Sequence, residues 1–299
     1  MMGYRHPGYA AALAEFGEPR HLPGCDGQVL VRHIGDSSWR DAMGPYPLFS
    51  CRDWKQLAAD VDALRGDLVS LSIVADPFGD YECADLARTF ETIIPFKHHY
   101  VVDLERPPGS YVSRHHRYYA RRALKNLEVE VCEQPADFVS DWSDLYQQLI
   151  LRHAIKGIQA FSPESFARQL KVPGMVAIKV REKNLLVGAH LWYVDGAVAY
   201  SHLAASSIRG YQLGCHYAAY ACALEHFRSR TRWLDLGAGA GVRSSNDGLT
   251  RFKEGWATGT RTAYFCGAVL NDKHYSELVA TRSAADSAYF PAYRTGERD

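Results

Sequence analysis

The clearest secondary-structure pattern in the sequence lies in residues 175–214, MVAIKVREKNLLVGAHLWYVDGAVAYSHLAASSIRGYQLG. Short apolar runs separated by turn residues predict three consecutive strands in it, at residues 175–180, 185–194 and 197–205. Asp195-Gly196 stands between the second and third of these and is the dipeptide most typical of a tight β-hairpin. The pattern therefore predicts an antiparallel meander, followed by a helix from about Tyr211 to Phe227.

The segments on either side extend this meander into a larger sheet. It is preceded by a strand at residues 127–131, a helix at residues 138–150 and a helix from Ser162. After the crossover helix come a strand at residues 233–236, a helix at residues 249–255 and a strand at residues 263–270. The helix after the meander is a crossover, which makes the strand at 233–236 parallel to its neighbour. This order predicts an α+β fold with a mixed, mostly antiparallel sheet and helices on both of its faces.

The first hundred residues predict a second, smaller unit. Residues 28–34 and 68–75 are strand-like, and residues 53–64 carry apolar side chains at helical spacing. The breaker Pro107-Pro108-Gly109 follows this part of the chain. We therefore expect two domains, at residues 1–106 and 107–299.

Charge and composition limit the class of protein. The 299 residues hold 34 Lys+Arg and 34 Asp+Glu, so a polyanion would have to bind a local patch. The seven cysteines include no C-x-x-C pair and the histidines lack i, i+4 spacing, so we predict neither a disulfide framework nor a metal site. No apolar run approaches the roughly 18 residues of a spanning helix, and the N-terminus lacks a signal-peptide core. We expect a cytoplasmic protein without a membrane span.

The turn after the meander, IRGYQLG at residues 208–214, is a candidate anion site. Amides at a helix N-terminus attract phosphate, glycines let it approach the backbone, and a guanidinium adds charge. The alternative is an ordinary strand-to-helix turn. The candidate cofactor-binding residues are Ile208, Arg209, Gly210 and Gly214.

The strand order together with this turn resembles the GNAT superfamily of acyltransferases. In that superfamily an R-G-x-G-x-G loop holds the diphosphate of acetyl-CoA. Arg209, Gly210 and Gly214 match it here, and Gln212 replaces the middle glycine. The resemblance implies direct attack of an amine on a thioester. It also implies that the strand at 197–205 splays from its neighbour, which makes Tyr200 and His202 candidates for substrate contact. Packed polar core residues are the alternative.

Two later motifs resemble those of the Fem-type transferases. WLDLG at residues 233–237 is similar to their D-x-G motif, and GLTRFKEGW at residues 248–256 to their F-K-x-G-[FW] motif. The basic helix at residues 114–125 is similar to a segment that precedes the first strand of their second domain. The resemblance implies two GNAT-like domains, of which the N-terminal one is smaller and degenerate, and it implies transfer of an acyl or aminoacyl group to an amine.

The same resemblance makes Lys253 the leading catalytic candidate. An ammonium beside an acyl carbonyl stabilises developing negative charge. Asp235 ends a strand beside the crossover, where a carboxylate orients an amine or accepts its proton. The alternatives are a surface lysine and a carboxylate that caps the following loop.

The donor has two candidates. The phosphate loop favours acetyl-CoA or another acyl-CoA as co-substrate. The alternative is aminoacyl-tRNA, because the basic helix offers a surface to a tRNA acceptor stem through Arg114, Arg117, Arg121, Arg122 and Lys125. The alternative interpretation is that these cations form an ordinary solvent-exposed face of the helix. The acceptor is a small-molecule or peptide amine.

Two other interpretations compete with transfer of an acyl group. DLGAGAG at residues 235–241 resembles the first motif of SAM-dependent methyltransferases, in which glycines let the backbone approach the cofactor. Only 58 residues follow Gly241, too few for a doubly wound domain, and residues 242–247 lack helical periodicity. The other interpretation is a catalytically inert GNAT-like binding module, suggested by Gln212.

Overall fold

The computed structural model describes residues 1–239, 247–282, 284 and 287–296, and it contains two compact units. Unit 1 comprises Met1–His6, Lys97–Ile155 and Ala160–Thr262; unit 2 comprises Pro7–Phe96, Lys156–Gln159 and Ala263–Asp299. This division differs from the expected consecutive domains 1–106 and 107–299. The reason is that two long strands, β5 (Thr92–Asp103) and β11 (Gly259–Val269), each contribute residues to both units.

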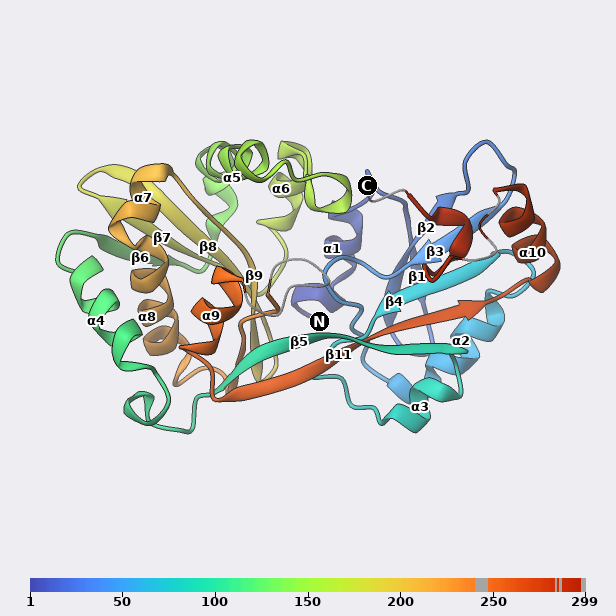
Figure 1. The fold of residues 1–299 in the computed structure, drawn as a ribbon, viewed down its shortest axis with the longest axis horizontal. Coiled ribbons are helices and arrows are strands. Elements are labelled where there is room, and N and C mark those ends of the chain that lie inside the picture. Colours follow the sequence, from blue (N-terminus) through green and yellow to red (C-terminus); the bar gives the residue numbers. More distant parts are fainter. Residues whose placement is uncertain (240–246, 283, 285–286, 297–299) are drawn as a thin grey trace. The chain divides into compact units, whose positions relative to one another are not determined.

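Unit 1 is built on the predicted meander. Its strands are β6 (Glu128–Cys132), β7 (Met175–Glu182), β8 (Leu185–Asp195), β9 (Val198–Ser206) and β10 (Trp233–Asp235), together with part of β5. They lie in the order β5-β10-β9-β8-β7-β6 (Figure 1), and only β9 and β10 are parallel. The predicted α+β class with a mixed, mostly antiparallel sheet is confirmed.

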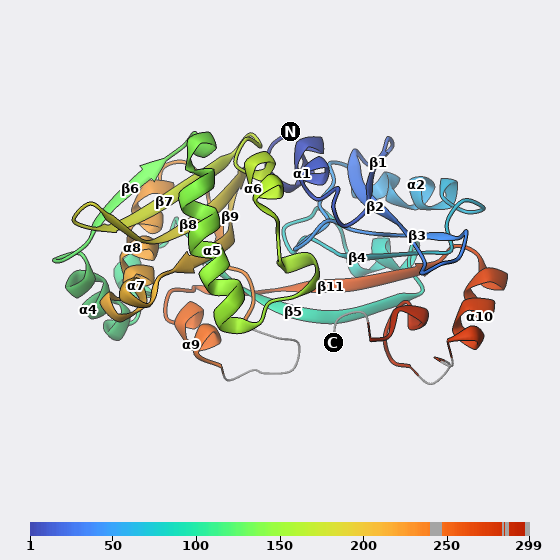
Figure 2. The same cartoon turned by 90° about the horizontal axis from the view of Figure 1, so that it is seen from above.

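Helices cover both faces of this sheet (Figures 1 and 2). They are α4 (Arg114–Ala123), α5 (Val139–His153), α6 (Pro163–Gln169), α7 (Ile208–Leu213), α8 (Cys215–Phe227) and α9 (Gly248–Glu254). Adjacent strand residues point to opposite faces. Accordingly, Trp192 packs on Tyr220 of α8, while the hydroxyl of Tyr193 donates to the carbonyl of Gln169 in α6. Small residues of α8, such as Ala219, let that helix approach the sheet closely.

Unit 2 has its own hydrophobic core. Its elements are β1 (Glu18–Leu22), β2 (Gly27–His33), β3 (Arg40–Met43), β4 (Ser70–Val74), part of β11, and the helices α1 (Pro7–Ala12), α2 (Leu57–Ala63), α3 (Cys83–Ala87) and α10 (Asp272–Thr281). The pair β3–β4 is parallel because α2 crosses between them. Val29, Leu71 and Ile73 of the sheet pack against Leu57 and Val61 of α2.

Short 3-10 helices complete the chain, at Gly3–Arg5, Trp54–Gln56, Pro108–Ser110, Pro135–Phe138, Gly157–Gln159 and Ala292–Arg294. None of the helices in the described residues is both long and apolar enough to cross a bilayer.

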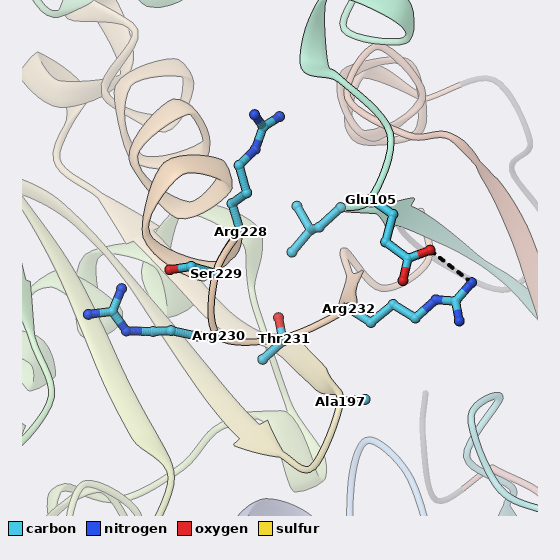
Figure 3. Close-up of a pocket in the computed structure, with 8 residues that line it drawn as sticks. Glu105, Ala197, Arg228, Ser229, Arg230, Thr231 and Arg232 are labelled. Carbon is cyan, nitrogen blue, oxygen red and sulfur yellow. Dashed lines mark ion pairs between the residues drawn. The ribbon is translucent and has the colours of Figure 1, made fainter.

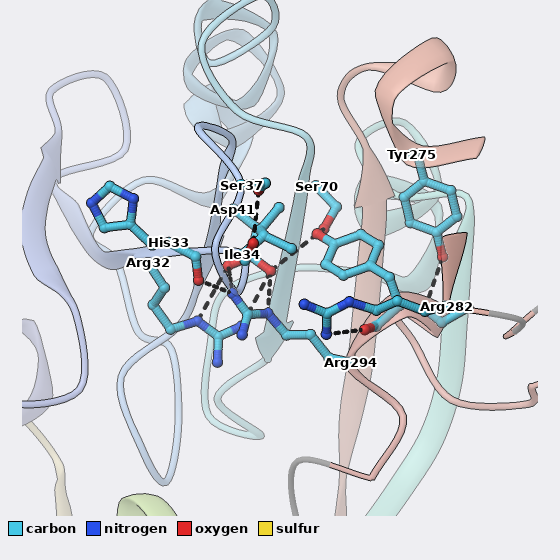
Figure 4. Close-up of polar contacts among 11 residues, drawn as sticks. Arg32, His33, Ile34, Ser37, Asp41, Ser70, Tyr275, Arg282 and Arg294 are labelled. Carbon is cyan, nitrogen blue, oxygen red and sulfur yellow. Dashed lines mark hydrogen bonds and ion pairs between the residues drawn. The ribbon is translucent and has the colours of Figure 1, made fainter. Parts of the chain in front are cut away.

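A buried ion pair ties the C-terminal segment of unit 2 to β3 (Figure 4). Asp41 is fully buried and accepts hydrogen bonds from Nε and Nη2 of Arg294, at 2.5 and 2.9 Å. The hydroxyl of Tyr293 donates to the same carboxylate at 3.0 Å, and Arg294 also donates to the carbonyl of His33 at 2.7 Å. Arg294 is itself only 6% exposed, so its positive charge is shielded from water and is compensated by the carboxylate of Asp41.

Replacing Asp41 with Asn should therefore lower the free energy of unfolding by about 3–5 kcal/mol, since it leaves a buried guanidinium without its counter-charge. Urea denaturation measures this. The control is Asp67→Asn, which removes an exposed carboxylate paired with Arg20 and Arg40 and should cost at most about 1 kcal/mol. Equal effects of the two substitutions would contradict this role for Asp41.

Candidate active site

The neighbouring strands β9 and β10 part soon after they meet. Their parallel pairing covers three residues of each strand and ends where Asp235 faces Tyr200, although β9 continues to Ser206. After Asp235 the chain follows β5 instead, because Leu236 donates to the carbonyl of Tyr100 at 2.8 Å and Tyr100 donates to the carbonyl of Gly237 at 3.0 Å. The rest of β9 is therefore left with an edge that no described strand of the ladder covers. Strand ends at such a crossover are where open sheets place their sites.

Asp235 stands at the point of divergence and is fixed from two sides. Its carboxylate is 2% exposed and lies 2.8 and 3.0 Å from Nδ1 of His99, a buried residue of β5. The amide of Gly237 donates to the same carboxylate at 2.7 Å. Because a carboxylate accepts, Nδ1 of His99 carries the proton. His99 as a whole is 7% exposed, and its Nε2 makes no hydrogen bond with any described residue.

Lys253 reaches the same strand end from α9. Its Nζ donates to the carbonyl of Ala238 at 2.6 Å, and a Cβ added to Gly237 would lie 3.1 Å from that nitrogen. Gly237 has φ +71°, a conformation that favours glycine. The pKa of Lys253 is lowered to about 8, chiefly by burial and also by the nearby Lys97, while the charges of Asp235 and Asp247 oppose the shift.

Aromatic packing holds α9 and therefore Lys253 in place. Phe252 and Trp256 lie against the ring of Tyr220 in α8, with centroids 5.1 and 5.8 Å apart. His116 of α4 donates from Nε2 to the carbonyl of Phe252 at 2.9 Å. A Cβ on Gly255 would lie 2.1 Å from the ring of His116, so the glycine of the F-K-x-G-W motif permits this contact. The motif residues around the lysine thus have a packing function.

Tyr200 and His202 lie in a buried polar cluster. Nε2 of His202 is 2.9 Å from Oε1 of Gln169, and Nδ1 is 3.1 Å from the hydroxyl of Tyr4. Burial lowers the pKa of His202 to about 3, so its ring is neutral. Tyr200 is 6% exposed and packs edge-on against Tyr4. These contacts hold the β9 surface against the N-terminus and α6.

The predicted phosphate loop is a helix. Residues Ile208–Leu213 form α7, whereas we expected a helix to begin near Tyr211. The reason is a local cap, because the hydroxyl of Ser207 accepts from the amide of Gly210 at 3.0 Å. Nε of Arg209 donates to Glu182 at 2.8 Å.

The glycines of this segment also have packing and turn functions. A Cβ on Gly210 would lie 2.0 Å from the carbonyl oxygen of Val187, so this position requires glycine for close packing on β8. Gly214 has φ +72° and separates α7 from α8. Ile208 is 67% exposed. The groups that the diphosphate interpretation requires therefore already have partners within the chain: the amide of Gly210 bonds Ser207, the guanidinium of Arg209 bonds Glu182, and Gly210 packs on β8.

Gly239, in the segment after β10, lies against α9. A Cβ on Gly239 would lie 2.0 Å from Oγ1 of Thr250, so this glycine permits close contact with the helix. Residues 240–246, which include the end of the methyltransferase-like motif, lie outside the described residues. The sheet is mostly antiparallel, whereas the methyltransferase interpretation requires a doubly wound parallel one. The methyltransferase interpretation is therefore incompatible with the fold.

A surface cavity of about 350 Å³ lies at the other end of β10 (Figure 3). Arginines 228, 230 and 232 line it and point in different directions. Arg232 pairs with Glu105 at 3.3 Å and Arg230 with Glu133 at 3.6 Å, so these guanidiniums do not converge on one ligand. Within the described residues, no group of three or more His, Cys, Asp or Glu side chains is arranged to hold a metal ion.

Comparisons with known proteins show the fold. The sequence matches no family model and no curated protein. The structure is similar to the C-terminal domain of an Agrobacterium fabrum protein assigned as a lysylphosphatidylglycerol synthetase, with TM-score 0.65 and 17% identity over 93% of this chain and 92% of that one. It is also similar to FemX, with TM-score 0.64 and 13% identity over 90% and 92% of the two chains, and to L-PGS from Bacillus licheniformis, with TM-score 0.60 and 14% identity over 93% and 96%. These similarities show that the chain shares the fold of these three proteins.

The lowered pKa of Lys253 predicts how stability depends on pH. The folded-state pKa of about 8 lies below the ordinary 10.5, so between these values the unfolded chain binds more protons than the folded one at this site. The stability of the wild type relative to Lys253→Met should therefore rise as the pH increases from 8 to 10.5. Urea denaturation of both proteins at pH 7.5 and 10 measures the difference. If the two proteins differ in their free energy of unfolding by the same amount at both pH values, the pKa of Lys253 is not lowered by burial, and this interpretation is wrong.

Proposed function

We propose that the chain transfers an aminoacyl group from aminoacyl-tRNA to an amine. The observation that carries the chemistry is the Lys253 ammonium, held at the carboxyl end of β10 where β9 and β10 part. The fold supports this proposal, because the Fem-type transferases that the motifs resemble join aminoacyl or acyl groups to amines. The site therefore requires a place for the donor carbonyl, a donor-binding surface and an acceptor amine.

Lys253 suits the stabilisation of an acyl-transfer intermediate. Attack of the amine on the ester carbonyl creates an oxyanion, which a nearby ammonium stabilises by charge and hydrogen bonding. With a pKa of about 8, the side chain is protonated in roughly tenfold excess at pH 7 and is still acidic enough to give a proton to the leaving ribose oxygen. Asp235 raises that pKa by its negative charge, so it helps keep Lys253 protonated.

We choose between the two donors by asking which cations have no ion-pair partner in the protein and can therefore bind the phosphates of a donor. Arg114, Arg121, Arg122 and Lys125 on and just after α4 are exposed, and their side chains make no ion pair with any described residue. By contrast, Arg209 in the expected phosphate loop is paired with Glu182. A row of unpaired cations on a helix suits the repeated phosphates of RNA. Tyr118, 59% exposed on the same helix, adds an aromatic face for base stacking.

Acyl-CoA is the second candidate donor, and one observation favours it. The N-terminus of α8, a 13-residue helix, follows Gly214 and has no side-chain cap. The amide of Tyr217 donates to the carbonyl of Gly214 at 2.9 Å, and the uncapped end of the helix dipole suits a diphosphate. On this alternative the same lysine acts on a thioester.

The donor proposal predicts tRNA binding through α4. A mixture of aminoacylated tRNA should bind, and the double variant Arg121→Ala, Arg122→Ala should bind more weakly, with a dependence of log affinity on log salt that is shallower by about 2. Filter binding at several salt concentrations measures both. The control Arg209→Ala removes a paired cation and should leave binding unchanged. Stabilisation by acetyl-CoA in a thermal melt, without tRNA binding, would favour the acyl-CoA alternative and refute this one.

The chemical proposal predicts the effect of removing the ammonium. Lys253→Met should reduce transfer from aminoacyl-tRNA to ethylamine at least tenfold, because the oxyanion loses its counter-charge. Quenched-flow measurement of labelled amide gives the rate, and circular dichroism checks that the variant is folded. An unchanged rate would remove Lys253 from the mechanism.

A further inference from the structure

We propose that His99, oriented by Asp235, is the general base that removes the proton of the attacking amine. This assignment rests on the proposed function and adds a catalytic residue to it. His99 lies in β5, 136 positions before its carboxylate partner in the sequence, and the antiparallel pairing of Asp235 with Val101 brings the two together.

The geometry of the pair determines its tautomer. Both oxygens of Asp235 lie within 3.0 Å of Nδ1 of His99, so that nitrogen is the donor and Nε2 keeps its lone pair. Within the described part of the chain, Nε2 makes no hydrogen bond, so its lone pair is available to a proton donor. A carboxylate that fixes one imidazole nitrogen and leaves the other as an acceptor is the arrangement that general bases use.

Asp235 itself is poorly suited to touch the amine. It is 2% exposed, and His99 and the amide of Gly237 already occupy its oxygens. Its negative charge instead stabilises the imidazolium that forms when His99 accepts a proton. Asp235 is therefore a positioning residue in this account, and His99 is the residue that meets the substrate.

Lys253 and His99 divide the proton transfers of the reaction. The amine nitrogen forms a bond to the acyl carbon and gives its proton to Nε2 of His99. The bond between the acyl carbon and the ribose oxygen then breaks, and that oxygen takes a proton from Lys253. Exchange with solvent returns both side chains to their starting states, so an amine and an ester become an amide and an alcohol. The field of Asp235 acts on both groups, on His99 by direct contact and on Lys253 through space.

The test compares two adjacent histidines on opposite faces of β5. His99→Asn keeps a donor for Asp235 but loses Nε2, and should reduce transfer from aminoacyl-tRNA to ethylamine by about 10²–10⁴-fold. His98→Asn is the control, because His98 is exposed and its nearest polar partner is Oγ1 of Thr262 at 3.3 Å. It should stay within threefold of the wild type.

Hydroxylamine as acceptor separates a base from a structural role. It loses its proton more readily than ethylamine, so His99→Asn should lose less than tenfold with it. Equal losses with both acceptors, or an ethylamine rate within threefold of the wild type, would overturn the assignment. If wild-type protein transfers to neither acceptor, the proposed function fails.

A measurement on wild-type protein does not depend on activity or on the folding of a variant. Nitrogen-15 NMR of histidine-labelled protein should show His99 with Nδ1 protonated and Nε2 unprotonated at neutral pH. The reverse tautomer would overturn the assignment.

Discussion

The structure of the site depends on the turn at Gly237, where the chain leaves β9 and continues along β5. This turn limits β9–β10 pairing to three residues, so beyond Tyr200 no described strand pairs with β9 on that side. The amide of Gly237 fixes Asp235, and the missing Cβ lets Lys253 come close. A larger residue would oppose both the backbone conformation and the approach of the ammonium. One backbone constraint therefore organises the strand edge, the carboxylate and the lysine.

The packing of α9 explains how the protein tolerates a shielded ammonium. Removing a cation from water costs free energy unless the cation finds partners. Here a carbonyl accepts from Lys253, while Phe252 and Trp256 anchor its helix against α8. The packing of these aromatic side chains thus offsets the free-energy cost of burying the ammonium of Lys253. Functional sites commonly hold a side chain in an environment that is unfavourable for folding.

The local parts of this arrangement could be predicted from the sequence, and the long-range parts could not. The meander followed from apolar runs and Asp195-Gly196, and the structure confirms it. Lys253 and Asp235 were singled out by short motifs. His99 was missed as a site residue because its partner is 136 positions away, and only the strand pairing joins them. The form of α7 was mispredicted because the glycines of residues 208–214 suggest a turn, whereas the side chain of Ser207 caps a helix there.

The most direct test of the account is the structure of the protein with a short RNA hairpin that carries an amino acid in stable amide linkage at its 3′ end. The account predicts that the carbonyl oxygen of the amino acid lies within hydrogen-bond reach of Nζ of Lys253, about 2.6–3.2 Å. The same carbonyl is expected to lie beside the part of β9 beyond Tyr200, which no described strand pairs on the β10 side. An amino acid bound elsewhere on the protein, with Lys253 still bonded only to Ala238, would contradict the central claim.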